Sequence, residues 1–569
     1  MLFRSAHPAW GIEPKELWKL SLSAHKNRHF WLEAMLEQEG QFADIAEWLI
    51  YTAHLSLHEP LEYILDHLTG TVEDQVSDNE REEAEDAAVT THEGFQSPLR
   101  DYFFAHDLLE QKPAVYVSYL DALATIRRRV RDYRPEGQLL LRDFMYCIDK
   151  YRELGIGIQG NGHIVDDHQP VELLTAHRSK GLEFDTVYVI GLADSVWGET
   201  ARSRGRLINY PHNLPIGITG DSSDEHIRLL FVALTRAKTN LVLSTHQTNG
   251  NGKSLLPVGY LNHVSVAHEE STTPAIELYE TMWHSHLSNI GNHSMQELLR
   301  DTLAKYKLSA THLCNFIDVS RGGPELFLLQ NLLRFPQAMS PSAAFGSAVH
   351  STLQRAHAHL TATGKKRPVE DLLGDFEAAL NEYQLASDQM AYFAKKGSDV
   401  LSAFFTARYD SFSPTQRVEQ SFGSDGVMLG AARLSGAIDL MDIDEETKTI
   451  RVTDYKTGKS TTSWQGRTEY EKIKLHHYRQ QLMFYKLLIE NSRQYAGYTV
   501  TRGIIEYVEP DDRGTINRIE LDYDATELNE FNELIQGVWQ RILALNFTTE
   551  VDYDKTLAGI KAFEVEIRS

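Results

Sequence analysis

The stretch RVTDYKTGK, residues 451–459, decides the fold of the second half of the chain, together with GAIDLMDI at residues 436–443. Both segments alternate apolar and polar residues as strands do, and the DEETKT between them is typical of a hairpin turn. Residues i and i+2 of a strand point to the same face, so we expect Asp454 and Lys456 to lie side by side. Asp439 belongs to the neighbouring strand. Two acids and a lysine on adjoining strands suit a divalent metal ion and the phosphodiester that it activates.

Further motifs complete a pattern around this strand pair. The stretch FGSAVH, residues 345–350, opens a helical segment, and Glu419 lies on an earlier strand. Gln481 and Tyr485 are four residues apart, so on a helix they share one face. Together with the GAID and DYKTGK motifs, these residues resemble the nuclease core of RecB-type members of the PD-(D/E)XK superfamily.

That resemblance implies a metal-dependent DNA nuclease with Mg²⁺ or Mn²⁺ as its cofactor. Asp439 and Asp454 would supply oxygen ligands, which hard divalent cations prefer. His350 would be a nitrogen ligand, which shifts the preference toward Mn²⁺. Lys456 would position the attacking water or offset negative charge that develops on the phosphate.

The resemblance also gives Gln481 and Tyr485 a place in the catalytic group, where they would contact DNA or support the metal ligands. Each residue taken alone has an ordinary structural interpretation. A D-x-K strand motif is usually a solvated ion pair, His350 alone would be a structural histidine, and Tyr485 alone would belong to the core. Glu419 fits either role. The joint occurrence of the motifs favours the nuclease.

Composition restricts the class of protein. At 569 residues the chain should hold three or four domains, and its 42% hydrophobic share is ordinary for a globular protein. Cys147 and Cys314 are too few for a disulfide framework or a four-cysteine iron–sulfur cluster, and they fit a reducing cytoplasm. No run approaches the roughly 20 apolar residues that cross a bilayer, and the N-terminus lacks a signal-peptide core. We therefore expect a cytoplasmic protein with no membrane contact.

The formal net charge of -24 argues against a protein that holds polyanions by bulk charge. It leaves room for a nucleic-acid enzyme whose basic residues line one channel. Many of the acidic residues are clustered at residues 73–89, which are predicted to be a solvated loop. The basic run RRRVR, residues 127–131, could contact DNA phosphates, but an exposed helix face is the favoured interpretation.

Two blocks in the first half form a second pattern. VELLTAHRSKGLEFDTVYVIGL, residues 171–192, predicts strand, loop and strand, and EHIRLLFVALTRAKTNLVLS, residues 225–244, predicts a helix that runs into a strand. These blocks resemble motifs V and VI of UvrD-type superfamily 1 helicases. The matching residues are His177, Lys180, Gly181, Leu182 and Glu183 in the first block, and Arg228, Leu229, Val232, Ala233, Thr235, Arg236 and Ala237 in the second.

By this resemblance, Arg236 is an arginine finger that reaches the γ-phosphate of ATP, where a guanidinium stabilises transition-state charge. Alone, such an arginine would more simply form a surface salt bridge. His177, Lys180 and Thr175 would couple the site to single-stranded DNA. The residues implied in ATP binding or coupling are Glu183, Arg236, Lys180 and Gly181.

The G-x-x-x-x-G-K-[ST] phosphate loop with which such helicases begin is not found in the sequence. Residues 252–254 and 458–460 both read Gly-Lys-Ser, but Gln247 and Thr453 occupy the position of the first glycine. We therefore expect the ATP-binding lobe to be missing from this chain: either the gene is split or truncated, or a partner chain supplies the lobe. ATP would then be a cofactor only with that lobe present, whereas the nuclease has no such dependency.

The expected fold class is α/β: a partial RecA-like helicase lobe with a helical insertion, followed by a PD-(D/E)XK restriction-endonuclease-like α/β domain. Residues 1–165 would be a remnant of the second helicase lobe plus a mostly helical insertion, and 166–250 the C-terminal part of that lobe. Residues 251–305 would be a linker and 306–569 the nuclease domain.

The expected function is a metal-dependent DNA exonuclease attached to part of an ATP-dependent 3′–5′ DNA helicase, acting in double-strand break repair and recombination. Its partners would be single-stranded DNA or duplex ends and a second helicase–nuclease chain. Two alternatives stay open. One is a non-catalytic scaffold protein that binds DNA within a helicase–nuclease complex, and the other is a translocase half that a second chain completes.

Overall fold

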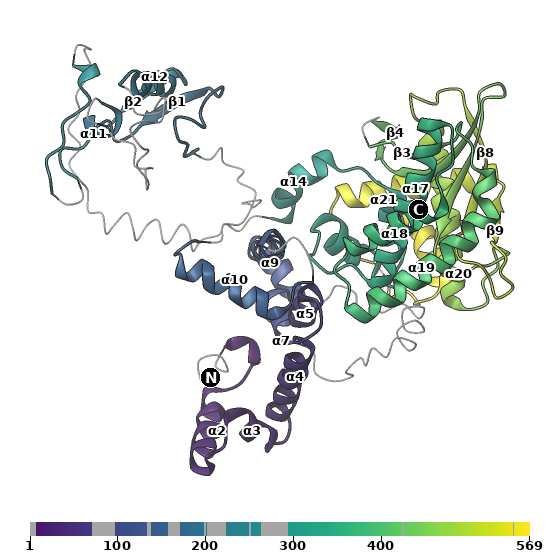
Figure 1. Cartoon of the computed structure of the whole chain (residues 1–569), viewed down its shortest axis with the longest axis horizontal. Coiled ribbons are helices and arrows are strands. Elements are labelled where there is room, and N and C mark those ends of the chain that lie inside the picture. The colour runs from purple at the N-terminus through teal and green to yellow at the C-terminus, as the bar shows by residue number, and fades with distance from the viewer. Residues whose placement is uncertain are drawn as a thin grey trace. The chain divides into compact units, whose positions relative to one another are not determined.

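The chain forms two compact units, Met1–Val165 with Asn289–Ser569, and Asp166–Ser288. This arrangement comes from a computed structural model (Figure 1). The residues that it describes are 7–70, 97–133, 138–157, 171–198, 201, 223–249, 252–262, 294–423, 426–549 and 551–569.

The larger unit contains a five-stranded sheet in the order β3-β6-β7-β8-β9. Its neighbours pair antiparallel except β7 and β8, which are parallel. A parallel pair needs a long crossover connection, and helix α20, Glu469–Glu490, lies in that connection. The strands are β3 Arg417–Ser421, β6 Ala437–Asp444, β7 Thr449–Lys456, β8 Thr499–Tyr507 and β9 Arg518–Leu521, while β4 Val427–Leu429 and β5 Ala432–Leu434 form a separate two-stranded sheet.

Helices pack on both faces of the five-stranded sheet (Figure 1). Because strand side chains alternate, Val452 of β7 joins the core with α20 and α21, whereas Tyr455 joins the core with α17 to α19. The helices after residue 306 are α15 Ala310–Ile317, α16 Gly323–Phe327, η3 Leu328–Leu332, α17 Pro341–Thr363, α18 Val369–Asn381, α19 Ser387–Arg408, η4 Tyr409–Ser411, α20, α21 Ala525–Leu543 and α22 Leu557–Arg568.

N-terminal helices share a hydrophobic core with the second half of the chain. Tyr116 and Leu120 of α9 belong to the same cluster as Leu299 and Leu303 of α14, which also includes residues of the five-stranded sheet. The end of the segment predicted as a linker is thus a packed helix. These elements are η1 Pro8–Trp10, α2 Pro14–Asn27, α3 Trp31–Leu36, α4 Gln41–Leu55, α5 Leu61–Thr69, α7 Pro98–Phe103, α8 His106–Gln111, α9 Pro113–Tyr133, α10 Leu141–Glu153 and α14 Met295–Lys305.

In the basic run 127–131, Arg129 and Arg131 are exposed as the helix-face interpretation expects, but Arg127 is not. The Arg127 side chain is 5% exposed and forms ion pairs with Glu62 and Asp66 of α5. Asp66 also accepts the backbone N–H of Ala338 over 2.7 Å, so one carboxylate joins α5, α9 and the segment that leads into α17. The positive charge of Arg127 is therefore used inside the protein. The acidic loop predicted at residues 73–89 lies outside the described residues.

The smaller unit is built on two parallel strands, β1 Phe184–Val189 and β2 Ala237–Leu243. Helix α12, Ser223–Leu234, precedes β2 as the second block predicted, and Leu230 and Val189 share a small core. Residues 171–175, expected to be a strand, have no regular secondary structure, and the chain turns at 176–181. The remaining elements are α11 Asp194–Trp197 and η2 Gly259–Leu261.

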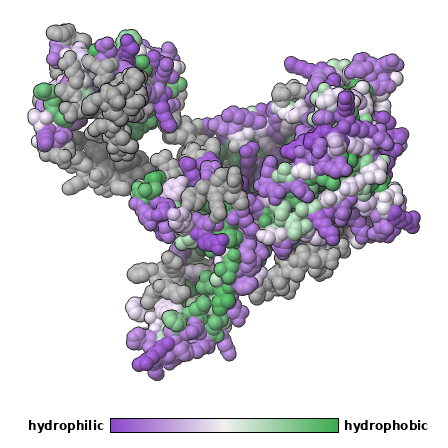
Figure 2. All heavy atoms as spheres, in the orientation of Figure 1, coloured by the Kyte–Doolittle hydropathy of each residue, from purple (hydrophilic) through white to green (hydrophobic). Residues whose placement is uncertain are grey.

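Hydrophobic side chains gather on the surface along helices α4 and α5 (Figure 2). Ile50 and Tyr63 on these helices are 44% and 41% exposed. The described part of the chain therefore leaves an apolar face on its N-terminal helices. Among the described helices, none combines the length and hydropathy that crossing a membrane requires.

Candidate metal centre and helicase motifs

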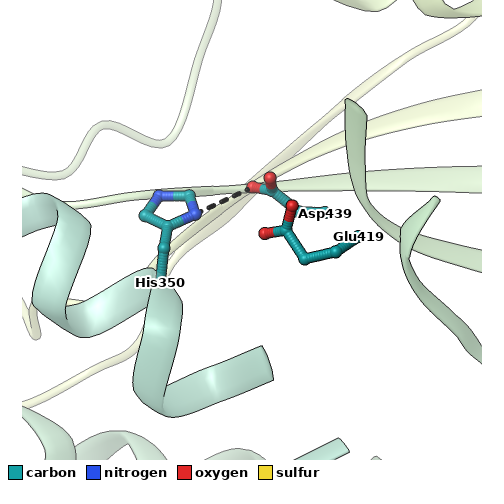
Figure 3. A group of neighbouring side chains, drawn as sticks. All are labelled: His350, Glu419 and Asp439. Atoms are coloured by element: carbon teal, nitrogen blue, oxygen red, sulfur yellow. Dashed lines mark ion pairs between the residues drawn. The ribbon is translucent and has the colours of Figure 1, made fainter. Parts of the chain in front are cut away.

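Three potential metal ligands converge at the edge of the five-stranded sheet (Figure 3). His350 comes from α17, Glu419 from β3 and Asp439 from β6, and one ligand atom of each lies within 4.8 Å of the others. His350 Nδ1 is 3.4 Å from Asp439 Oδ2. Helix α17 can approach closely because its Gly346 has no side chain: a Cβ there would lie 3.3 Å from Thr457 Oγ1. One nitrogen and two carboxylates form a donor set suited to Mn²⁺ or Mg²⁺.

Strand pairing places the two carboxylates opposite each other. Val418 pairs with Leu440 and Gln420 with Ile438, so Glu419 faces Asp439 between these pairs. Glu419 has a φ of 48°, in the left-handed region that a non-glycine residue enters at a cost of about 1 kcal/mol. Strain of this kind persists where the surrounding structure requires it, and here it lies at a cluster of charged side chains.

Asp454 lies beside this cluster, buried and held by three neighbouring side chains. Its Oδ2 is 2.9 Å from Lys456 Nζ, and its Oδ1 accepts hydrogen bonds from Gln481 Nε2 at 2.9 Å and from the Tyr485 hydroxyl at 3.0 Å. Gln481 Oε1 also accepts from Lys456 Nζ at 2.9 Å, so this amide bridges the acid and the lysine. The Asp454 side chain is 2% exposed. Packing and hydrogen bonds thus fix its orientation.

The electrostatics of the cluster are those of crowded acids. Burial raises the pKa of Glu419, and Asp439 adds to the rise. Burial also raises the pKa of Asp454, with Asp439 adding to the rise and Lys456 opposing it. For His350, burial favours the neutral ring, but the Asp439 carboxylate outweighs it and the pKa is raised. A divalent cation would relieve this repulsion, so the residues present fit a metal ion.

The sequence predicted His350, Asp439 and Asp454 as the metal ligands. The structure brings the first two together with Glu419, and it places Asp454 among Lys456, Gln481 and Tyr485. The sequence alone does not assign Glu419, because a single strand pattern does not reveal which residue faces Asp439. The register of β3 on β6 provides that information.

In the smaller unit, the structure brings Arg236 to the first helicase block. Arg236 Nη1 donates to the carbonyl oxygen of Leu182 at 3.0 Å, and its Nε donates to that of Val232 at 3.0 Å. Leu182 lies between Gly181, which has a φ of 87°, and Glu183, whose Oε2 is 3.7 Å from Lys238 Nζ. Three of the predicted ATP-site residues therefore lie at one end of β1.

His177 and Lys180 lie on the turn that precedes this point, and Thr175 comes directly before that turn. The Thr175 carbonyl oxygen accepts the Ser179 N–H at 3.1 Å, and His177 and Lys180 are exposed. Their predicted contact with single-stranded DNA stays a prediction, as do the ATP contacts of the neighbouring residues.

Comparison with known families agrees with both halves of this geometry. Residues 307–556 match the PD-(D/E)XK nuclease superfamily, and residues 113–248 match the UvrD-like helicase C-terminal domain. The chain joins a UvrD-like helicase C-terminal region to a PD-(D/E)XK nuclease domain. The predicted fold class is confirmed. Nucleases of this superfamily generally use a divalent metal ion, and helicases use ATP.

Curated relatives include proteins of both kinds. The chain is 31% identical over 169 residues to YjcD of Bacillus subtilis, named as an ATP-dependent DNA helicase, covering 27% of this chain and 20% of that protein. It is 32% identical over 142 residues to a protein of Geobacillus thermodenitrificans named as an ATP-dependent helicase/nuclease, covering 21% and 11%. Against the ATP-dependent DNA helicase PcrA of Staphylococcus aureus it is 32% identical over 104 residues, covering 17% and 12%. The chain thus matches a fifth or less of the length of these relatives.

Proposed function

We propose that the second half of the chain hydrolyses DNA phosphodiester bonds with the help of a divalent metal ion. The observation that carries this proposal is the meeting of His350, Glu419 and Asp439 beside the Asp454–Lys456 ion pair. A structural ion pair would neutralise one acid with one base. Here three carboxylates lie close to one histidine and one lysine, and only Asp454 pairs with that lysine, which leaves negative charge for a cation to balance.

Each side chain then has a distinct task. His350, Asp439 and Asp454, with Glu419 beside them, would hold Mg²⁺ or Mn²⁺, which supplies a Lewis acid and a water of lowered pKa. Lys456 would orient the attacking water and offset charge on the phosphate. Gln481 and Tyr485 hold Asp454, and Gln481 also holds Lys456. These two residues of α20 therefore fix Asp454 and Lys456 relative to each other.

The substrate that we propose is DNA, degraded from a single-stranded or duplex end in the repair and recombination of double-strand breaks. Support comes from the relative named as an ATP-dependent helicase/nuclease. We further propose that the chain works with a second helicase–nuclease protein as its partner.

For the first half we propose a role in ATP-driven 3′–5′ unwinding, with the ATP-binding lobe contributed by a partner chain. Arg236, Glu183, Lys180 and Gly181 would face the nucleotide, and Thr175 and His177 would contact single-stranded DNA. The hydrogen bond from Arg236 to Leu182 supports this role, because it places the guanidinium beside the Gly181–Glu183 turn.

The test is cleavage of end-labelled DNA by the purified chain with Mg²⁺ or Mn²⁺, with and without ATP. The proposal predicts ATP-independent cleavage that Asp454→Asn abolishes. Asp442→Asn is a matched control, because this β6 acid pairs instead with Arg451 at 3.3 Å on the strand surface. Tight DNA binding without cleavage would indicate the scaffold alternative. ATP hydrolysis that appears only with a second chain would indicate the completed translocase.

A further inference from the structure

We propose that Tyr478 is a positioning residue for Lys456, and this inference rests on the proposed nuclease function. The Lys456 ammonium nitrogen lies 4.7 Å from the centroid of the Tyr478 ring. That distance falls within the range of about 6 Å over which a cation is attracted to the face of an aromatic ring. Neither strand motif nor helix motif pointed to Tyr478.

The ring completes the surroundings of the ammonium group. Lysine has three N–H donors; Lys456 Nζ donates to Gln481 Oε1 at 2.9 Å and forms an ion pair with Asp454 Oδ2 at 2.9 Å. Both of these oxygen atoms belong to side chains of the candidate metal centre. The Tyr478 ring offers attraction without a strong acceptor, so it confines the ammonium while leaving hydrogen-bonding capacity for a phosphate oxygen or water.

Helix α20 presents Tyr478, Gln481 and Tyr485 at positions i, i+3 and i+7, which share one helix face. Gln481 and Tyr485 hold Asp454 while Tyr478 contacts Lys456, so one helix face orients both members of the ion pair. Tyr478 itself is partly buried and packs against the larger hydrophobic core, which limits its movement. A rigid ring beside a flexible four-carbon side chain reduces the number of positions that Lys456 occupies.

A purely structural tyrosine is the competing explanation, and a double-mutant cycle separates the two. Single-turnover cleavage at saturating DNA and metal would be measured for Tyr478→Phe, Tyr478→Leu and Lys456→Ala, and for the Lys456→Ala/Tyr478→Leu double variant. Thermal unfolding and DNA affinity would be measured beside it. Tyr478→Met is the second variant should leucine impair folding, because it keeps much of the volume and removes the ring face.

We expect Tyr478→Phe to cleave within about twofold of the unmodified chain, because the ring face remains. Tyr478→Leu should cleave roughly 3- to 30-fold more slowly with unchanged DNA affinity. In the Lys456→Ala background the leucine substitution should have no further effect. Tyr498→Leu is the matched control: Lys448 Nζ lies 4.6 Å from that ring at the β6–β7 hairpin, and cleavage should stay unchanged.

Two results would overturn the inference. One is that Tyr478→Leu lowers the cleavage rate by the same factor in the unmodified and the Lys456→Ala backgrounds. The other is that Tyr478→Phe cleaves as slowly as Tyr478→Leu. Absence of cleavage by the unmodified chain would instead contradict the proposed nuclease function, and this inference would fall with it.

Discussion

The backbone N–H of Tyr455 donates a hydrogen bond to Oδ2 of Asp439 over 2.8 Å. This bond orients the Asp439 carboxylate from a point on β7 midway between Asp454 and Lys456. The Tyr455 side chain is 2% exposed and packs into the core with α17 to α19. Core packing on one face of the sheet thus sets the position of a carboxylate at the candidate metal centre.

The strained backbone at Glu419 predicts opposite effects on stability and metal binding. Glu419→Gly should raise the free energy of unfolding of the metal-free protein by up to about 1 kcal/mol, because glycine accepts the φ of 48° and one repelling charge is lost. The same change should weaken Mn²⁺ binding. Lys448→Gly is the control, since Lys448 has a φ of 54° in the hairpin turn and should leave metal affinity unchanged. Urea unfolding and calorimetric titration measure the two quantities, and unaltered Mn²⁺ affinity in Glu419→Gly would exclude Glu419 from the site.

Metal affinity should fall as pH falls, because the metal displaces protons. The pKa of His350 is raised by Asp439, and the pKa values of Glu419 and Asp454 are raised by burial. The metal-free site therefore holds protons at a higher pH than the free side chains would, and the dissociation constant for Mn²⁺ should increase from about pH 8 to about pH 6. Titrations at several pH values check this. A constant affinity across that range would contradict the account.

The buried Arg127 should be important for stability. Arg127→Met leaves Glu62 and Asp66 without their shared cation, and breaking a buried ion pair by removing one partner costs about 3–5 kcal/mol. Arg129→Met on a less buried side of α9 is the control and should change stability by less than about 0.5 kcal/mol. Chemical denaturation compares them, and equal stability of both variants would mean that the ion pair adds nothing.

His357 should make the protein sensitive to acid. Its ring is 1% exposed, stacks on Phe412 and contacts the Tyr455 hydroxyl at 3.2 Å, and burial lowers its pKa from 6.5 to about 4. The unfolded state then binds a proton more readily between those pH values. The free energy of unfolding should therefore decrease as the pH is lowered from 6.5 to about 4. For this group the decrease is up to about 1.4 kcal/mol per pH unit. His357→Gln should show a shallower decline, and identical slopes would show that His357 does not titrate as proposed.

The sequence predicted the strand pair and its hairpin because alternation and turn residues are local signals. It also predicted one site made of His350, Asp439, Asp454, Lys456, Gln481 and Tyr485. The distances place His350 beside Asp439, and they place Asp454 with Lys456, Gln481 and Tyr485. Their joint role in a metal site stays a prediction. What it did not reveal depends on pairing between distant segments. Glu419 was identified by the register of β3 on β6, and the burial of Arg127 depends on Glu62 of α5, 65 residues away along the chain.

The helices show the same contrast between local signals, which can be predicted, and contacts between distant segments, which cannot. The second block of helicase residues gave α12 and β2 from local periodicity alone. The core that α9 and α14 share with the five-stranded sheet could not be predicted. The apolar face of an amphipathic helix shows that it packs against something, but not against which surface.

The most direct test of the metal centre is a calorimetric titration of the metal-free chain with Mn²⁺ at neutral pH, comparing the unmodified protein with Asp439→Asn and Asp442→Asn. We predict a Mn²⁺ site in the unmodified chain and in Asp442→Asn, and affinity at least about 10-fold weaker in Asp439→Asn. Equal binding by all three proteins, or no binding by the unmodified chain, would contradict the proposal that these strands hold a catalytic cation.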